Sequence, residues 1–181
     1  MHLHTYIPYN VDGNLGKAYN DFMKMVDDDD WVCFLDADAM FTTRNYYTHM
    51  LEVIETNPDY GLFTAMTNRV RPNSYQLFED VSRENHDIYY HRKVGLEKNN
   101  KHYNKVLNLN SLSFPHLLSG VVLLLSKATW KAVGGFCDGF LGVDNDIHKR
   151  CIDHSINVGL IRGLYVYHWY RGDGSIDHFP K

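Results

Sequence analysis

Two aspartates, Asp36 and Asp38, directly follow the apolar run Trp31–Leu35 and could together bind a divalent cation. Two residues apart in an extended chain, their side chains can point to the same side. Carboxylate oxygens are the ligands of hard cations such as Mg²⁺, and Mn²⁺ accepts them as well. A cation held there would neutralise a diphosphate and stabilise it as a leaving group. Aspartate pairs also occur in simple acidic turns at strand ends, which is the alternative interpretation.

The elements that would position these aspartates alternate between strands and helices. The run Trp31–Leu35 is apolar throughout, as is typical of a strand buried on both faces of a parallel sheet. Other predicted strands cover residues 3–7, 61–66, 117–125 and 158–167. Predicted helices cover residues 14–26, 42–56, 127–133 and 144–154. The pattern predicts an α/β fold with a mostly parallel central sheet flanked by helices, and ligands bind at the carboxyl ends of such strands.

Length and composition limit the classes of protein to which this chain can belong. A chain of 181 residues is expected to form one domain, residues 1–181. Its formal net charge of −4 gives no basic field for nucleic acid. Its three cysteines have no metal-site spacing and are expected to be reduced thiols of a cytoplasmic protein. No apolar run reaches the ~20 residues of a membrane helix, which leaves peripheral association with a membrane open.

Two polar regions carry no clear catalytic pattern. The acidic run Asp27–Asp30 is predicted to be a solvated turn. Residues 68–115 are polar and irregular, and we expect one or two helices and a binding loop there.

The sequence NLGKAYN at residues 14–20 and FLDAD at residues 34–38 resembles the donor half of GT-A-fold glycosyltransferases, close to glycosyltransferase family 2. The resemblance implies that Asp36, Ala37 and Asp38 hold the metal and the diphosphate. It also implies that the donor lies at the helix start formed by Asn14, Gly16 and Lys17. A helix N-terminus with a lysine in its first turn attracts anions, although a solvent-facing lysine would have the same pattern.

The second half of the chain resembles the acceptor half of the same fold. Gly120 matches a strand position where a small residue lets the donor sugar approach the backbone. The sequence GVDNDIHKR at residues 142–150 is similar to the family segment G-E-D-x-D, with valine in place of glutamate. In inverting members this aspartate is the general base, which points to Asp144, with Asp146 as the second candidate. Helix capping and dipole compensation are the structural alternatives for both.

The resemblance implies a third metal ligand, His168, just after the last strand. Imidazole is a good ligand for Mn²⁺ and a poorer one for Mg²⁺.

Other donor contacts are expected at scattered positions. The resemblance implies that longer family members read the base with a unit that has no counterpart ahead of residue 14. Tyr6, Pro8 and Asn10 would then supply the base contacts, and the alternative is that the base is held differently. Asn68 and Arg69 follow a strand end and are candidates for contacts with the sugar or phosphates, with loop solvation as the alternative. Arg171 is expected to contact an anion from a flap.

These expectations amount to a Mn²⁺- or Mg²⁺-dependent transferase. The resemblance implies that it moves a sugar from a nucleotide-sugar donor, expected to be a UDP-sugar, to a hydroxyl of a glycan, a lipid-linked or another acceptor, with inversion. A non-catalytic module that binds nucleotide sugars is one alternative. A phosphatase of the haloacid-dehalogenase type, which also uses a strand ending in D-x-D, is another.

Overall fold

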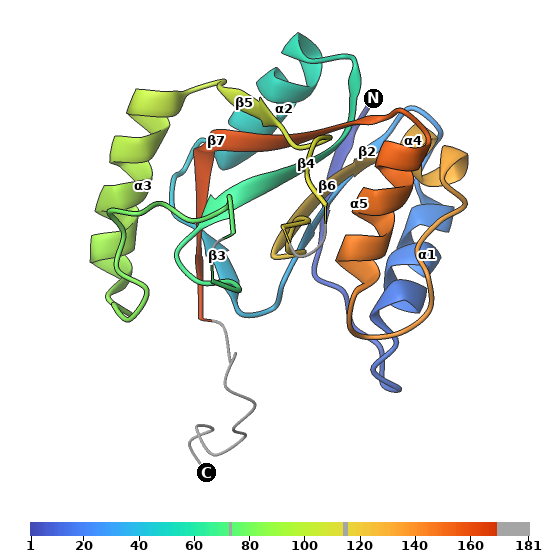
Figure 1. The fold of residues 1–181 in the computed structure, drawn as a ribbon, viewed down its shortest axis with the longest axis horizontal. Coiled ribbons are helices and arrows are strands. Elements are labelled where there is room, and N and C mark those ends of the chain that lie inside the picture. The colour runs from blue at the N-terminus through green and yellow to red at the C-terminus, as the bar shows by residue number, and fades with distance from the viewer. Residues whose placement is uncertain (73, 114–115, 170–181) are drawn as a thin grey trace.

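The computed structural model describes residues 1–72, 74–113 and 116–169, in which strands and helices alternate (Figure 1). The strands are β1 Leu3–Tyr6, β2 Trp31–Leu35, β3 Ala39–Phe41, β4 Tyr60–Thr67, β5 Val106–Asn108, β6 Val122–Ser126 and β7 Asn157–His168. The helices are α1 Leu15–Met25, α2 Tyr46–Thr56, α3 Ile88–His102, α4 Lys127–Ala132 and α5 Val143–Asp153. The predicted α/β class is confirmed. Within the described residues, no helix has the length and apolar character needed to cross a membrane.

The strands form one mixed sheet in the order β1-β2-β6-β4-β7-β3, with β5 also paired to β7. Among the described strands, only the β1–β2 and β4–β7 pairings are parallel, and the other four are antiparallel. The prediction of a mostly parallel sheet is therefore wrong. The reason is that β6 lies between β2 and β4 and runs opposite to both. Since β1, β2, β4 and β7 still share one direction, their carboxyl ends meet at one edge.

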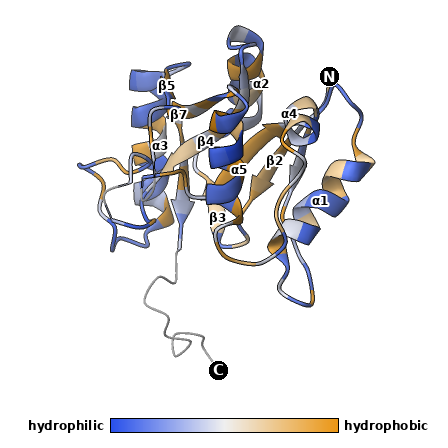
Figure 2. Ribbon diagram, turned by 45° about the vertical axis from the view of Figure 1, so that its right-hand side comes forward, coloured by the Kyte–Doolittle hydropathy of each residue, from blue (hydrophilic) through white to orange (hydrophobic). Residues whose placement is uncertain are grey.

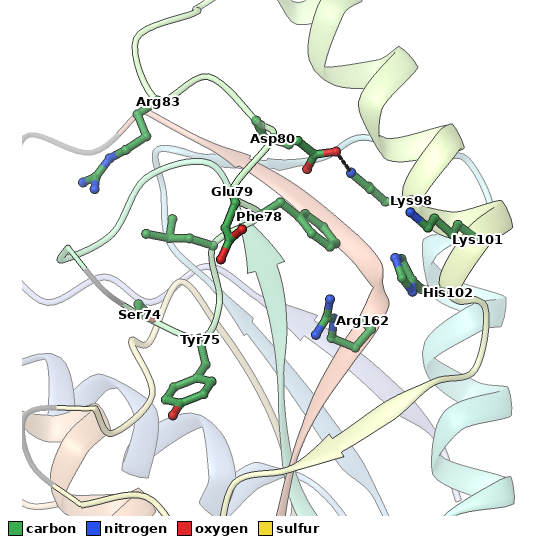
Figure 3. Close-up of a pocket in the computed structure, with 12 residues that line it drawn as sticks. Ser74, Tyr75, Phe78, Glu79, Asp80, Arg83, Lys98, Lys101, His102 and Arg162 are labelled. Carbon is green, nitrogen blue, oxygen red and sulfur yellow. Dashed lines mark hydrogen bonds and ion pairs between the residues drawn. The ribbon is translucent and has the colours of Figure 1, made fainter.

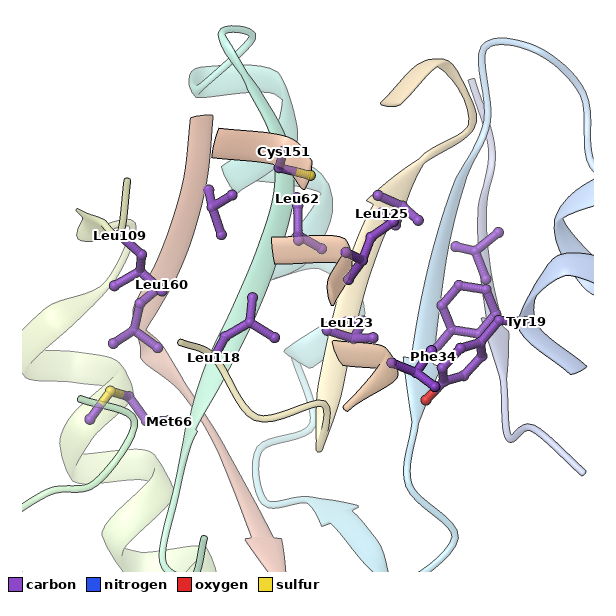
Figure 4. Close-up of a cluster of buried hydrophobic side chains, with 14 of the residues drawn as sticks. Tyr19, Phe34, Leu62, Met66, Leu109, Leu118, Leu123, Leu125, Cys151 and Leu160 are labelled. Atoms are coloured by element: carbon purple, nitrogen blue, oxygen red, sulfur yellow. The ribbon is translucent and has the colours of Figure 1, made fainter. Parts of the chain in front are cut away.

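Side chains on alternate faces of the sheet build two separate hydrophobic clusters. On β2, Val32 and Phe34 face a cluster that includes Tyr19 of α1 and Ile147 of α5 (Figure 4). The intervening side chains, such as Cys33, belong to the other cluster, with residues of α2. The result is a sheet between two helical layers. Figure 2 shows hydrophobic colour on β2 and hydrophilic residues on the outer sides of α1 and α5.

Some local features differ from the sequence prediction. The three-residue strands β3 and β5 were not predicted, because so short a segment has almost no periodicity. Helix α2 begins at Tyr46 rather than near Thr42, whose hydroxyl donates a hydrogen bond to the Tyr165 carbonyl at 2.7 Å. Helix α3, by contrast, confirms the prediction that residues 68–115 contain a helix, and it packs beside β7 (Figure 1).

The acidic run Asp27–Asp30 is only partly the predicted solvated turn. Asp30 is buried, with 2% of its surface exposed. Its carboxylate accepts hydrogen bonds from the His2 backbone N–H at 2.6 Å and from His4 Nε2 at 2.9 Å. These hydrogen bonds, that of His4 first, lower the pKa of Asp30 to about 2. The aspartate thus ties strand β1 to the start of β2.

The start of α1 docks tightly against the loop that follows α4. The Gly16 N–H donates to the Gly139 carbonyl at 3.1 Å, and a Cβ on Gly16 would lie only 1.8 Å from the Cys137 carbonyl oxygen. One turn later, the Asn20 side chain bonds both backbone groups of Phe136 at 2.9 and 2.8 Å. The first turns of α1 are therefore in direct contact with residues 136–139.

We predict that Gly16→Ala destabilises the protein by about 2 kcal/mol or more, because the added methyl group must displace backbone. Helix propensity alone would give the opposite sign, since Ala is favoured over Gly by ~1 kcal/mol inside a helix. Urea unfolding followed by circular dichroism measures the difference. The neighbouring Lys17→Ala is the control and should change stability by less than ~0.5 kcal/mol, because it removes only an exposed ion pair with Asp21. Equal stability of Gly16→Ala and wild type would contradict the contact.

Candidate functional site

The sheet edge at the carboxyl end of β2 brings three candidate ligands together. The Asp36 N–H donates to the Val121 carbonyl at 3.1 Å, and its own carbonyl accepts from the Ala39 N–H at 3.0 Å, so the chain turns directly after β2. Strand β3 then runs antiparallel to β7, with Ala39 opposite His168. The Trp169 N–H donates to the Asp38 carbonyl at 3.0 Å. The histidine is thus held beside both aspartates by backbone pairing.

The three side chains could hold one metal ion. His168 Nε2 lies 3.3 Å from Asp38 Oδ1 and 3.9 Å from Asp36 Oδ2, and one ligand atom from each residue lies within 4.8 Å of the others. In an octahedral site with bonds of about 2.1 Å, adjacent ligand atoms are about 3 Å apart and opposite ones about 4 Å apart. The spacing therefore fits a small divalent cation. The His168 side chain is buried and the two carboxylates are a quarter to a third exposed, which leaves room for a further ligand.

The orientation of the His168 ring is set by residues behind it. Its Nδ1 donates to the Arg69 carbonyl at 2.7 Å, which directs Nε2 toward the carboxylates. The Asn68 side chain accepts from the His168 N–H at 2.7 Å and donates to the His168 carbonyl at 3.2 Å. Asn68 is 1% exposed, and Arg69 Nη1 donates to the Trp169 carbonyl at 3.2 Å. Asn68 and Arg69 were predicted to bind the donor, and the contacts seen here position a candidate metal ligand.

The carboxylates make the site strongly electronegative. Burial raises the pKa of Asp36 to about 6; His168 opposes this shift, while Asp38 and Asp144 add to it. Burial, followed by the charges of Asp36 and Asp144, also raises the pKa of the Tyr19 hydroxyl far above its usual value. Three acidic groups thus share one poorly solvated corner, where a cation would relieve their repulsion.

Of the two predicted bases, Asp144 belongs to this corner. Its Oδ2 accepts from the Gly120 N–H at 2.8 Å, and its Oδ1 accepts from the Asn145 N–H at 2.8 Å. A Cβ on Gly120 would lie 3.0 Å from the Asp144 Cβ, so the glycine allows this approach. Asp146 instead forms an ion pair with Arg150.

Two residues that sequence inspection missed hold the segment before β6. The Gln76 side chain accepts from the Ser119 N–H at 2.6 Å and donates to the Ser119 carbonyl at 3.0 Å. The Arg71 guanidinium donates to the carbonyls of Leu117 at 2.6 Å and Leu118 at 3.1 Å. They fix the approach to Gly120. Their only signal in the sequence is their position shortly after a predicted strand, in the polar region 68–115.

The predicted donor residues around the α1 start have local structural contacts. The Asn10 side chain accepts from the Asn14 N–H at 3.3 Å and closes the turn before the helix. The Asn14 side chain caps α1 by accepting from the Lys17 N–H at 2.8 Å. Gly16 packs against the loop after α4, and Lys17 pairs with Asp21 at the exposed surface. These contacts account for the motif residues without a ligand, and donor binding by them stays a prediction.

The remaining predicted contacts are dispersed. The Tyr6 ring ends β1 and stacks on Phe22 with a centroid distance of 4.2 Å. Pro8 is half-buried in the following loop, and Ala37 is exposed between the two aspartates. Tyr6 lies at the same sheet edge as Asp36, because β1 and β2 are parallel. Arg171 lies outside the described residues.

No known family model matches the chain, and no curated protein matches its sequence. The site itself offers two carboxylates and an imidazole for a cation, with a third carboxylate beside them. Such a set can bind a metal with an anionic ligand and accept a proton from a neighbouring hydroxyl or water.

We predict that Asn68→Ala weakens Mn²⁺ binding by roughly 10- to 100-fold, because residues that orient a metal ligand typically contribute that much affinity. Isothermal titration calorimetry with Mn²⁺ measures the change. Asn100→Ala, at an exposed position of α3, is the control and should bind Mn²⁺ like the wild type. If Asn68→Ala keeps its fold and full Mn²⁺ affinity, the positioning role of Asn68 is wrong.

Proposed function

We propose that this chain is a metal-dependent glycosyltransferase with a GT-A-like fold, which transfers a sugar from a nucleotide-sugar donor to an acceptor hydroxyl. The observation that carries the proposal is the placement of Asp36, Asp38 and His168 around one point, with Asp144 on the neighbouring segment. These four residues come from three separate parts of the sequence, because Asp36 and Asp38 share one turn. Their convergence at the edge where the co-directional strands end is what a donor site in an α/β sheet requires.

Asp36, Asp38 and His168 would hold Mn²⁺, or less readily Mg²⁺, between them. When bound, the cation would offset the charge of the donor diphosphate and of the nucleoside diphosphate that departs. The two carboxylates would hold the cation close to the backbone turn that follows β2, while the buried imidazole sets its position from the β7 side. The donor of choice is a UDP-sugar, an expectation that rests on the family resemblance alone.

Asp144 would act as the general base. The acceptor hydroxyl loses its proton to the Asp144 carboxylate while its oxygen forms a bond to the anomeric carbon. The bond from that carbon to the phosphate oxygen breaks, and its electron pair leaves with the nucleoside diphosphate. Attack opposite to the leaving group inverts the anomeric centre. The two backbone N–H groups that bond Asp144 hold its carboxylate in one orientation for this transfer.

We predict that Asp38→Asn lowers Mn²⁺-dependent hydrolysis of the donor by ~100-fold or more, since the metal supplies several kcal/mol of charge stabilisation. The assay measures release of nucleoside diphosphate from a panel of nucleotide sugars with Mn²⁺ and with EDTA. The wild type should lose activity in EDTA. The control Asp59→Asn, at an exposed position directly before β4 and so at the end of that strand opposite to the site, should leave the rate unchanged. Wild-type turnover by a folded Asp38→Asn protein would contradict the metal assignment.

For the base, we predict that Asp144→Asn lowers the hydrolysis rate by roughly 10²- to 10⁴-fold, the usual contribution of a general base. Donor affinity, measured by calorimetry with Mn²⁺, should stay within a few-fold of the wild type. The matched variant Asp146→Asn should keep most activity, because Asp146 is paired with Arg150. If Asp146→Asn lowers the hydrolysis rate more than Asp144→Asn does, Asp146 is the general base and the assignment of Asp144 is wrong.

The same experiments separate the alternative functions. Saturable binding of a nucleotide sugar without release of nucleoside diphosphate in any reaction would favour a non-catalytic binding module. Release of phosphate from phosphate monoesters, with no hydrolysis of nucleotide sugars, would favour a phosphatase.

A further inference from the structure

A cavity of about 810 Å³ lies between the segment after β4, helix α3 and the middle of β7 (Figure 3). Its volume is within the range of sites that hold small organic ligands. The lining includes Phe78 and Arg83 from the segment after β4, Lys98 and Lys101 from α3, and Arg162 from β7. None of the proposed metal ligands, and neither of the candidate bases, lines it.

The cavity is basic although the whole chain is acidic. Four lining residues are positively charged (Arg83, Lys98, Lys101 and Arg162) and two are negatively charged (Glu79 and Asp80), an excess of two positive charges. The chain has a net charge of −4. Among the described residues, the only ion pair in the cavity joins Lys98 and Asp80 at 2.5 Å. The other three cations have no carboxylate partner in the described chain.

Two of the four cations, Lys98 and Arg162, lie close to one aromatic ring. Lys98 Nζ lies 4.6 Å from the Phe78 ring centroid, and the Arg162 guanidinium carbon lies 5.5 Å from it. The His102 ring stacks on Phe78 with a centroid distance of 5.9 Å. Burial, and then the charges of Arg162, Lys105, Lys101 and Lys98, lower the pKa of His102. Cation–π contacts hold like charges together here, and their mutual repulsion would be relieved by an anion.

The backbone is built to bring these groups together. The β4–β7 register jumps from Ala65↔Ile161 to Met66↔Tyr165, so residues 162–164 bulge out of the ladder and Arg162 is displaced toward the cavity. A Cβ on Gly163 would lie 2.8 Å from the His102 carbonyl oxygen. The glycine therefore lets the end of α3, with its basic side chains, lie directly against the bulge.

A structural role explains only part of this cluster. Basic side chains in the last turn of a helix are favoured by its dipole, which accounts for Lys101. It does not account for Arg162, which comes from a strand. The Arg162 Nε is buried and has no hydrogen-bond partner among the described residues. Arg162 as a whole is half-buried, and no carboxylate of the described residues offsets the charge of its guanidinium at the cavity wall.

We propose that this cavity binds a small organic phosphate monoester at a site separate from the metal centre. The excess of two positive charges matches the charge of a phosphate monoester near neutral pH, between about −1.5 and −2, better than that of a carboxylate. The fork of donors on Arg162 and the ammonium group of Lys101 can share the phosphate oxygens. The acidic surface of the rest of the chain disfavours an extended polyanion such as nucleic acid.

The test is calorimetric titration of the full chain with phenyl phosphate in EDTA, which keeps metal ions out of the measurement. We expect saturable binding at one site, and benzoate should bind at least ~10-fold more weakly. Arg162→Gln and Lys101→Gln should each weaken binding by about tenfold or more, the effect of losing one hydrogen bond to a charged group. Lys101 is exposed, so its variant tests the site even if Arg162→Gln is unstable.

Two controls separate this site from the metal centre and from general surface charge. Lys149→Gln, at an exposed position of α5, should bind phenyl phosphate like the wild type. Asp38→Asn should also bind it normally in EDTA, whatever becomes of the proposed transferase activity. The proposal is overturned if the wild type shows no saturable binding, if both cavity variants bind normally, or if benzoate binds equally well.

Discussion

The antiparallel pairing of β3 with β7 is the constraint on which the candidate site depends. The two aspartates lie on a turn after β2, at one side of the sheet, and His168 ends a strand that is separated from β2 by β6 and β4. A turn of this kind would ordinarily point into solvent. Because three residues of β3 pair with the end of β7, the turn is drawn across the sheet edge and both aspartates face His168.

The β3–β7 pairing places acidic groups where solvation is poor. Hydrogen bonds from the surrounding chain hold the residues of this site in place. Asn68 binds the backbone of His168 on both sides, and the Arg69 carbonyl fixes the imidazole tautomer. Gly120 provides a backbone donor for Asp144 at the entry to β6. The preceding residues are fixed by Gln76 and Arg71. Rigid backbone of this kind is what a site needs if its carboxylates are to stay close together.

Features marked by a local sequence pattern could be predicted, whereas features that depend on contacts between residues far apart in the sequence could not. Asp36 and Asp38 were identifiable because a local pattern, an apolar strand followed by D-x-D, marks them. His168 was found by resemblance and lies where expected, but its approach depends on β3, which is too short to leave a pattern. The position of β6 between β2 and β4 could not be predicted either, because sequence periodicity carries no information on strand order. The roles of Asn68 and Gln76 depend on hydrogen bonds to residues 100 and 43 positions away, and nothing in their neighbourhood encodes these partners.

The bulge in β7 affects both the basic cavity, through Arg162, and the acidic candidate site, through His168. If β7 continued in register after the Ala65↔Ile161 pair, Arg162 would face Met66. The residue three positions before His168 would then face Ala39. The tyrosine then opposite Ala39, Tyr165, would be a poor ligand for Mn²⁺ unless it is deprotonated, and a phenol with an ordinary pKa of about 10 keeps its proton near neutral pH. The three extra residues therefore do two things at once. They displace Arg162 from the ladder into the basic cavity, and they bring the histidine to the acidic edge. One change of strand register thus places Arg162 in the basic cavity and His168 at the acidic edge, both on β7.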